Sequence, residues 1–243
     1  MLNKIDKLYE LLFFDFEKEF KEIFNDTKSV AIVGNSEKLL NKNFGKEIDG
    51  YDFVIRFNRA PTKNYEKYVG QKTSLRVVAD NEFKSKDNGQ ENFSVSKGEN
   101  EDNYIGFVKK LFNSKILVIT DDYVNVKKNP YLYVDKSNKV YFFHNKLNNV
   151  IRFRISSRFN LIKKFNSYRY KPSLSSGILI VSLLCLMKIK PSIYGFEFFD
   201  NSNFYNHYFA NHKGKLTSPY HDKVYETFIL KNLISDKRVN FYK

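Results

Sequence analysis

The sequence predicts an α/β fold with a Rossmann-like, mostly parallel twisted sheet and helices on both of its faces. The main observation is that short apolar segments of strand length alternate along the chain with longer segments of helical periodicity. Such alternation is typical of parallel sheets that are covered on both sides. With 243 residues, the chain is long enough for one well-packed core, so a single domain over 1–243 is expected.

The expected elements follow from these segments in chain order. Strands are expected at 29–34, 51–58, 73–79, 115–120, 139–144, 192–199 and 238–242. Helices are expected at 2–24, from Asn35 or Ser36 onwards, and at 150–166, 175–189 and 222–234. Ligands of such sheets bind at the carboxyl ends of the strands, so functional residues are expected directly after strands.

Two segments stand apart from this alternation. Residues 1–28 contain an amphipathic helix whose apolar stripe is formed by Ile5, Leu8, Leu12, Phe16, Phe20 and Ile23. This stripe fits a helix packed on the domain, and it also fits a helix lying on a membrane surface, because Phe13 and Phe14 widen the apolar face. Residues 81–103 are polar and nearly free of apolar side chains, which predicts a mobile loop or lid.

The composition bounds the cellular setting and the partners. The formal net charge is +14, and it indicates either a biased composition rich in Lys, Asn, Phe and Tyr or an anionic partner. The single cysteine, Cys185, excludes an internal disulfide. The N-terminus lacks a signal-peptide pattern, and the apolar run 176–187 is too short to span a bilayer. A cytoplasmic protein is therefore expected.

The first candidate site is the turn Gly34-Asn35-Ser36, which follows a strand. A glycine there allows backbone N–H groups to approach a phosphate, and Asn35 and Ser36 add neutral hydrogen-bond donors. By itself this turn is weak evidence, because it matches neither a Walker loop nor the dinucleotide fingerprint. An ordinary structural turn explains it equally well.

The following segment is more specific. The run VAIVGNSEKLL, continued by GKEIDGYDFVIRFNRAPT and YEKYVGQKTSLRV, resembles the long motif of the sialyltransferase family. Three further matches occur in the order that this family uses. SSGILIVSLLCLMKIKPSIYGFEFF resembles the short motif, NHYF the third motif, and HDKVYE the very short motif. In that family a disulfide joins the long and short motifs, but Val30 and Lys188 occupy the corresponding positions here.

The resemblance implies a GT-A-like variant of the fold and a role for each matching residue. His221 is implied as the general base, and His207 as the ligand of the departing phosphate. The remaining implied substrate-binding residues are Gly34, Asn35, Ser36, Asn58, Ser175, Ser176, Gly177, Tyr208 and Glu226. Glu226 either orients the region of His221 or holds its helix. Arg56 either binds an anion or only packs its side chain over the sheet. No metal site is expected.

The implied reaction is the inverting, metal-independent transfer of a sialic acid from its CMP conjugate to a glycan hydroxyl. A bacterial-type enzyme of surface glycan synthesis is expected, acting on lipooligosaccharide or capsule, with no cofactor. A CMP-Kdo or other CMP-nonulosonate transferase fits the same motifs. The expected partners are the CMP-sugar, a glycan or glycolipid acceptor and the inner-membrane surface, but no nucleic acid. The competing hypothesis is a non-enzymatic nucleotide or nucleic-acid binding module, which the basic charge and the many Tyr and Phe residues favour.

Overall fold

The computed structural model describes residues 13–24, 27–58, 60–79, 115–120, 137–159, 174–197, 208–209 and 223–242. The expected lid over 81–103 lies outside these residues, as do 1–12, His207 and His221. What the sequence predicts for them stays a prediction.

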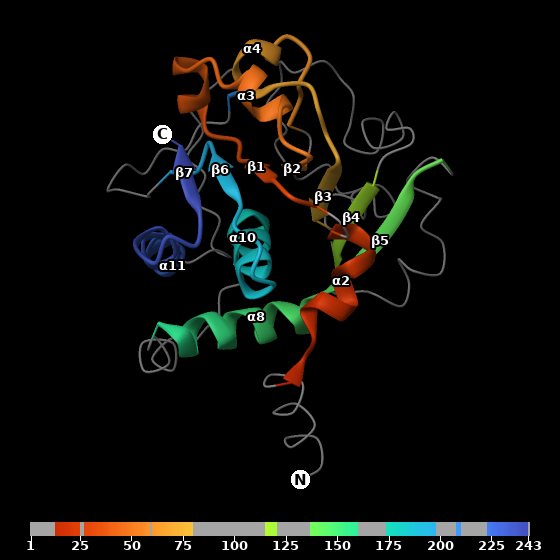
Figure 1. The fold of residues 1–243 in the computed structure, drawn as a ribbon, viewed down its shortest axis with the longest axis vertical. Helices are drawn as coiled ribbons and strands as arrows, with labels where there is room; N and C mark the ends of the chain where they lie inside the picture. Colours follow the sequence, from red (N-terminus) through yellow and green to blue (C-terminus); the bar gives the residue numbers. More distant parts are fainter. Residues whose placement is uncertain are drawn as a thin grey trace, which may run out of the picture.

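A seven-stranded parallel sheet forms the centre of the described structure (Figure 1), which confirms the predicted fold class. Its strands are β1 (Val30–Val33), β2 (Phe53–Phe57), β3 (Leu75–Ala79), β4 (Lys115–Thr120), β5 (Lys139–His144), β6 (Ser192–Tyr194) and β7 (Asn240–Tyr242). The strand order is β5-β4-β3-β2-β1-β6-β7, and all neighbours are parallel. The chain builds outwards from β1 to β5 and then returns to the other side of β1. The boundary between β1 and β6 is therefore the topological switch point, where ligands of open parallel sheets bind.

Helices cover both faces of the sheet. On one face, Val30 and Ile32 belong to a core shared with α2 (Phe16–Phe24), α8 (Asn145–Arg158), α10 (Ser176–Leu186) and α11 (Lys223–Ser235). On the other face, Ala31 and Val33 pack with residues of the 3₁₀ helix η1 (Glu37–Asn41) and of α3 (Gly45–Asp49) and α4 (Glu66–Val69). Figure 1 shows α8 and α10 on one side of the sheet and α3 and α4 on the other. Among the helices of the described residues, none is long and apolar enough to cross a membrane.

Four expected elements differ most from the structure. The helix expected over 2–24 is interrupted at residues 14–15, and α2 begins at Phe16 because the Asp15 carboxylate accepts the backbone N–H of Lys18 at 3.1 Å. The helix after Gly34 is only the five-residue η1. The strand expected over 192–199 ends at Tyr194, since Gly195 adopts φ +67°. Helix α8 spans 145–158 rather than 150–166, because β5 leads into it without a turn.

The described part of the N-terminal helix packs on the domain. Phe16, Phe20 and Ile23 are all buried in the core beneath α2, and Phe20 stacks on Phe143 of β5 with 5.7 Å between ring centroids. Phe13, in contrast, is 64% exposed. The apolar stripe of α2 is therefore used inside the protein.

Candidate active site

The predicted site residues of the first two strands lie at one edge of the sheet. Gly34 follows β1, Asn58 follows β2, and Gly195 follows β6. Because these strands are parallel neighbours, their carboxyl ends meet at the same edge. Gly34 and Gly195 come from the two strands that flank the switch point.

The two glycines allow the turns after β1 and β6 to touch. A Cβ atom on Gly34 would lie 2.4 Å from the carbonyl oxygen of Gly195, so no other residue fits without a backbone shift. The N–H of Gly34 donates to the carbonyl of Tyr194 at 2.7 Å, and that of Ser36 donates to Gly195 at 3.3 Å. The N–H groups of Gly34 and Ser36 are thus engaged within the protein. Packing against β6 is the reason for the glycine.

Asn35 lies between these two anchored residues. Its backbone carbonyl accepts the N–H of Tyr208 at 2.9 Å, which attaches the segment that begins with His207-Tyr208 to the end of β1. Its side-chain Oδ1 is buried and has no hydrogen-bond partner among the described residues. A buried amide without a hydrogen bond lowers the stability of the protein, unless a ligand forms that hydrogen bond. The amide can present either its oxygen or its nitrogen, so it can accept from a hydroxyl or donate to a phosphate.

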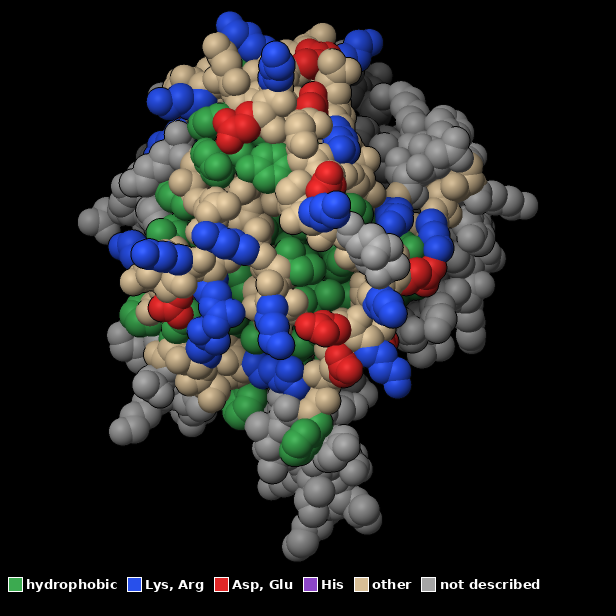
Figure 2. Space-filling view, in the orientation of Figure 1, with side chains coloured by type: hydrophobic (Ala, Val, Ile, Leu, Met, Phe, Trp, Pro, Cys, Tyr) green, Lys and Arg blue, Asp and Glu red, His purple; other side chains and the backbone are tan. Residues whose placement is uncertain are grey.

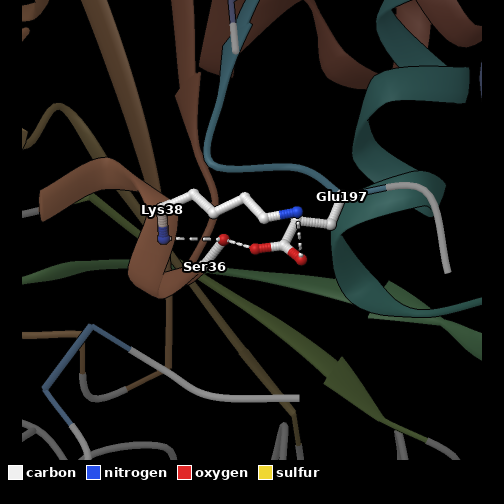
Figure 3. A network of polar contacts seen from close by, with 3 residues as sticks. All are labelled: Ser36, Lys38 and Glu197. Atoms are coloured by element: carbon white, nitrogen blue, oxygen red, sulfur yellow. Dashed lines mark hydrogen bonds and ion pairs between the residues drawn. The ribbon is translucent and has the colours of Figure 1, made fainter. Parts of the chain in front are cut away.

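Ser36 is held by a carboxylate that the motif analysis did not single out (Figure 3). Its hydroxyl donates to Oε1 of Glu197 and accepts the backbone N–H of Lys38 at 3.1 Å. The Lys38 ammonium lies 3.2 Å from Oε2 of Glu197. Ser36 is fully buried. Its hydroxyl therefore stabilises the turn, and its predicted role in substrate binding stays a prediction.

Asn58 adopts the left-handed conformation, with φ +45°, directly after β2. Its N–H donates to the carbonyl of Val77 on β3 at 2.8 Å. The guanidinium of Arg76 donates to the carbonyls of Asn58 and Ala60, at 3.2 and 3.0 Å. These contacts fix a half-buried amide side chain at the edge of the sheet, next to the strand that carries Gly34.

Arg56 lies on β2 and contacts the segment before β3. It is fully buried, and it donates to the carbonyls of Lys72 and Val69 and to the hydroxyl of Thr73, at 3.0, 2.6 and 3.2 Å. Burial lowers its pKa to about 10, so it stays charged at neutral pH. Arg56 thus braces the loop between α4 and β3, and its second terminal nitrogen is buried without a hydrogen-bond partner among the described residues. Arg56 also contributes positive potential behind the site.

Tyr208 packs against the residues that follow β1 and β2. Only 4% of its surface is exposed, its ring meets that of Tyr65 edge-on at 5.0 Å, and its hydroxyl donates to the carbonyl of Pro61 at 2.5 Å. Burial raises the pKa of this phenol to about 12, against the opposing charges of Arg56 and Arg76. Tyr208 was predicted to bind substrate. Its described contacts are those of an anchor for the residue before it.

The start of α10 joins the same cluster. Ser175 caps this helix, with its hydroxyl accepting the N–H of Ile178 at 3.4 Å. A Cβ atom on Gly177 would lie 2.9 Å from the ring of Phe196, and the same ring lies 3.3 Å from a Cβ atom on Gly34. Ser175, Ser176 and Gly177 are therefore neighbours of the Gly34 turn, as the sequence predicted for one shared site. All three are half-buried.

Glu226 links α11 to this helix start. Its buried carboxylate accepts the backbone N–H and the hydroxyl of Ser175, each at 2.6 Å. These two contacts tie α11 to the start of α10. Glu226 comes five residues after His221 in the sequence, so the helix that follows this histidine is tied to the site.

The candidate catalytic residues His207 and His221 lie outside the described residues. Within the described part, no three His, Cys, Asp or Glu side chains lie close enough to hold a metal ion. The residues that the motif analysis missed are Glu197 and Lys38. One signal was available for Glu197, because it is the single charge in the otherwise apolar run SIYGFEFF.

This architecture defines an α/β protein with a topological switch point in its parallel sheet, the place where sheets of this kind bind their ligands. The family model described as glycosyltransferase family 29 (sialyltransferase) matches residues 1–238, and the chain belongs to this family.

Relatives and solved structures agree with this assignment. The chain is 54% identical over 48 residues to beta-galactoside alpha-2,6-sialyltransferase 2 of Xenopus tropicalis, over 20% of this chain and 9% of that protein. It is 59% identical over 47 residues to the CMP-N-acetylneuraminate-beta-1,4-galactoside alpha-2,3-sialyltransferase of Rattus norvegicus, over 19% and 13%. The matched segments thus span about a tenth of these relatives. A crystal structure of a mammalian sialyltransferase, in complex with Gal-beta-1-3GalNAc-ortho-nitrophenol, has a TM-score of 0.57 at 19% identity. It covers 100% of this chain and 86% of that chain, which shows the fold.

Proposed function

We propose that this protein is an inverting, metal-independent sialyltransferase that moves a sialic acid from its CMP conjugate to a glycan hydroxyl. The observation that carries the proposal is the family match over residues 1–238. The geometry adds support, because four of the family-like motifs contribute residues to one cluster at the switch point. These contributions are Asn35, Gly177, Tyr208 and Glu226.

The reaction needs three contributions from the protein. A base removes the proton of the acceptor hydroxyl, hydrogen-bond donors stabilise charge on the departing phosphate, and a pocket holds the reactants in line. We assign the base to His221 and the phosphate contact to His207. An imidazole suits proton removal near neutral pH, because its ordinary pKa is about 6.5. The anchoring of Tyr208 and of α11 to the site elements supports both assignments.

The donor itself is assigned to the polar groups at the switch point. Asn35 has a buried amide without a partner among the described residues, and Asn58 presents a second amide on the adjacent strand. The start of α10, with Ser175, Ser176 and Gly177, favours an anion such as the donor phosphate or carboxylate. Buried Arg56 and Arg76 add positive potential at this edge.

For the acceptor we propose a bacterial surface glycan, such as lipooligosaccharide or capsule, reached from the cytoplasmic side of the inner membrane. Peripheral contact with that membrane is supported by the formal charge of +14 and by exposed Phe13 beside α2. Lys and Arg side chains are spread over the face drawn in Figure 2, with acidic groups among them. Such a surface suits weak, reversible attraction to anionic lipid.

The experiment that tests the proposal compares wild type with His221→Ala. CMP-Neu5Ac and a galactoside acceptor should give turnover with wild type, in the presence of EDTA as well. The variant should lose transfer and keep CMP binding. Full activity of the variant removes His221 from the mechanism, and loss of activity in EDTA that Mn²⁺ restores contradicts the metal-free scheme.

A thermal-shift panel with CMP, UMP, GDP and ADP identifies the nucleotide independently of the acceptor. CMP at about 100 times its Kd should stabilise the protein by roughly 2.7 kcal/mol, and the other nucleotides by less. Turnover with CMP-Kdo but not with CMP-Neu5Ac would show that the donor carries the alternative acid sugar. Stabilisation by oligonucleotides alone, falling steeply with salt, would favour the nucleic-acid module instead.

A further inference from the structure

We infer that Glu197 is a positioning residue of the nucleotide site, and that Lys38 neutralises it so that an anionic donor can bind beside it. This inference rests on the proposed function. Figure 3 shows the three side chains involved, Ser36, Lys38 and Glu197, at the turn that follows β1. Neither Glu197 nor Lys38 belongs to the residues that the motifs single out.

The contacts of Glu197 show how it acts. One carboxylate oxygen accepts from the buried hydroxyl of Ser36, and the other lies 3.2 Å from the Lys38 ammonium. Ser36 comes from the turn after β1, and Glu197 from the turn after β6, two residues beyond Gly195. A charge-assisted hydrogen bond of this kind is about twice as strong as a neutral one. Glu197 therefore locks the two turns together across the switch point.

This lock determines where the Asn35 amide points. Gly34 and Ser36, on either side of Asn35, are both held by the carbonyls of Tyr194 and Gly195. The Ser36 hydroxyl is held by Glu197, so the turn cannot rotate without breaking that bond. Since Asn35 Oδ1 is buried without a partner among the described residues, the fixed turn preorganises it for a ligand.

The side chain of Lys38 is 64% exposed, whereas that of Glu197 is 22% exposed. Lys38 is therefore not expected to hold the turn in place as Glu197 does. An exposed ion pair contributes little to stability. The ion pair has a larger electrostatic effect on a ligand, because the carboxylate of Glu197 without Lys38 would repel a doubly anionic donor bound beside it. The ammonium of Lys38 cancels this repulsion. Lys38 is thus expected to affect binding of charged ligands and to leave neutral ligands unaffected.

The test measures the affinities of CMP and of uncharged cytidine by calorimetry for four variants. Glu197→Ala should weaken both ligands about tenfold, whereas Glu197→Gln keeps the acceptor for Ser36 and should stay within about twofold of wild type. Lys38→Met should weaken CMP about fivefold and leave cytidine unchanged. The double variant Lys38→Met with Glu197→Gln should recover CMP binding, because the charge to be neutralised is gone. Lys42→Met, an exposed lysine at the end of η1, is the matched control.

Several results would overturn this inference and leave the proposed function standing. Wild-type CMP affinity in Lys38→Met and in Glu197→Ala would do so, as would equal weakening of CMP and cytidine by Lys38→Met. A double variant as weak as Lys38→Met would exclude charge compensation. If Glu197→Ala does not fold, the Lys38→Met and double-variant arms still decide the outcome. Absence of CMP binding in wild type would instead overturn the proposed function, and this inference with it.

Discussion

Gly34 is constrained by its neighbour across the switch point rather than by its own conformation. A methyl group at this position would lie 2.4 Å from the backbone oxygen of Gly195. The turns after β1 and β6 would then separate, and the Asn35 amide would move with them. At Gly50 an added Cβ meets its nearest atom at 3.3 Å, so this position offers a milder control.

We predict that Gly34→Ala destabilises the protein by about 1–3 kcal/mol and weakens CMP binding, because backbone must shift to relieve the overlap. Chemical denaturation and calorimetric titration with CMP measure the two effects. Gly50→Ala should change both quantities little. A Gly34→Ala variant that matches wild type in stability and affinity would show that the contact with Gly195 does not shape the site.

Tyr208 provides a pH-dependent test of the anchor beside His207. Burial raises its pKa to about 12, above the ordinary value of about 10. The native state therefore keeps a proton that the unfolded chain releases, and the stabilisation is present below about pH 10 and lost as the pH approaches 12. We predict that the stability advantage of wild type over Tyr208→Phe shrinks by about 2 kcal/mol between pH 9 and 12. Urea unfolding at both pH values measures it, and a constant difference would contradict the buried anchor.

At the residue scale, the sequence identified positions better than it identified roles. Gly34, Asn35 and Gly177 do gather at one edge, because the motif spacing places each at the end of a strand or the start of a helix. Ser36 and Tyr208 each form a hydrogen bond with a protein group that the sequence did not indicate. Those partners, Glu197 and Pro61, are more than a hundred residues away in the chain, and local pattern carries no information about such pairs.

Two phenylalanines in and before helix α2 differ sharply in burial. Phe20 is buried and stacked on Phe143, whereas Phe13 is 64% exposed. We predict that Phe20→Ala costs about 3–5 kcal/mol of stability, because it leaves a cavity between α2 and the sheet. Phe13→Ala should cost less than about 0.5 kcal/mol. Thermal unfolding of both variants measures this contrast, and equal small losses would mean that α2 is not packed on the domain.

The contact between α10 and α11 couples the nucleotide end of one helix to the helix that follows His221. We predict that Glu226→Ala and Ser175→Ala each destabilise the protein by about 1–3 kcal/mol and weaken CMP binding. Because the two residues share two hydrogen bonds of 2.6 Å, their effects should not add. A double-mutant cycle measured by denaturation tests this. Strict additivity would show that Glu226 acts elsewhere.

The type of each element was predictable because its hydrophobic pattern is strong. The predicted boundaries were wrong where a single residue interrupts or ends an element inside a continuous apolar pattern. The expected strands contain all seven observed ones, since apolar runs mark them clearly. The apolar stripe of the N-terminal helix continues across residues 14–15, so periodicity alone hides the break that Asp15 makes. Likewise the run after Ser192 stays apolar, but Gly195 turns the chain out of the sheet.

At the scale of the whole molecule, the strand order brings the candidate site residues together. It puts β1 and β6, far apart in sequence, side by side with their carboxyl ends together. Sequence alternation predicts a parallel sheet, but it does not predict where the order reverses. The switch point, with Gly34 on one side and Gly195 on the other, is therefore a result of the structure. Family membership over residues 1–238 supports the transfer reaction that we propose for this edge of the sheet.

The most direct measurement is a crystal structure with CMP bound. The account predicts that the nucleotide lies at the switch point, with its polar groups completing the Asn35 amide and its phosphate near the start of α10. Cytidylate bound at any other edge or face, with Asn35 left unpaired and Gly177 uncovered, would contradict the central claim.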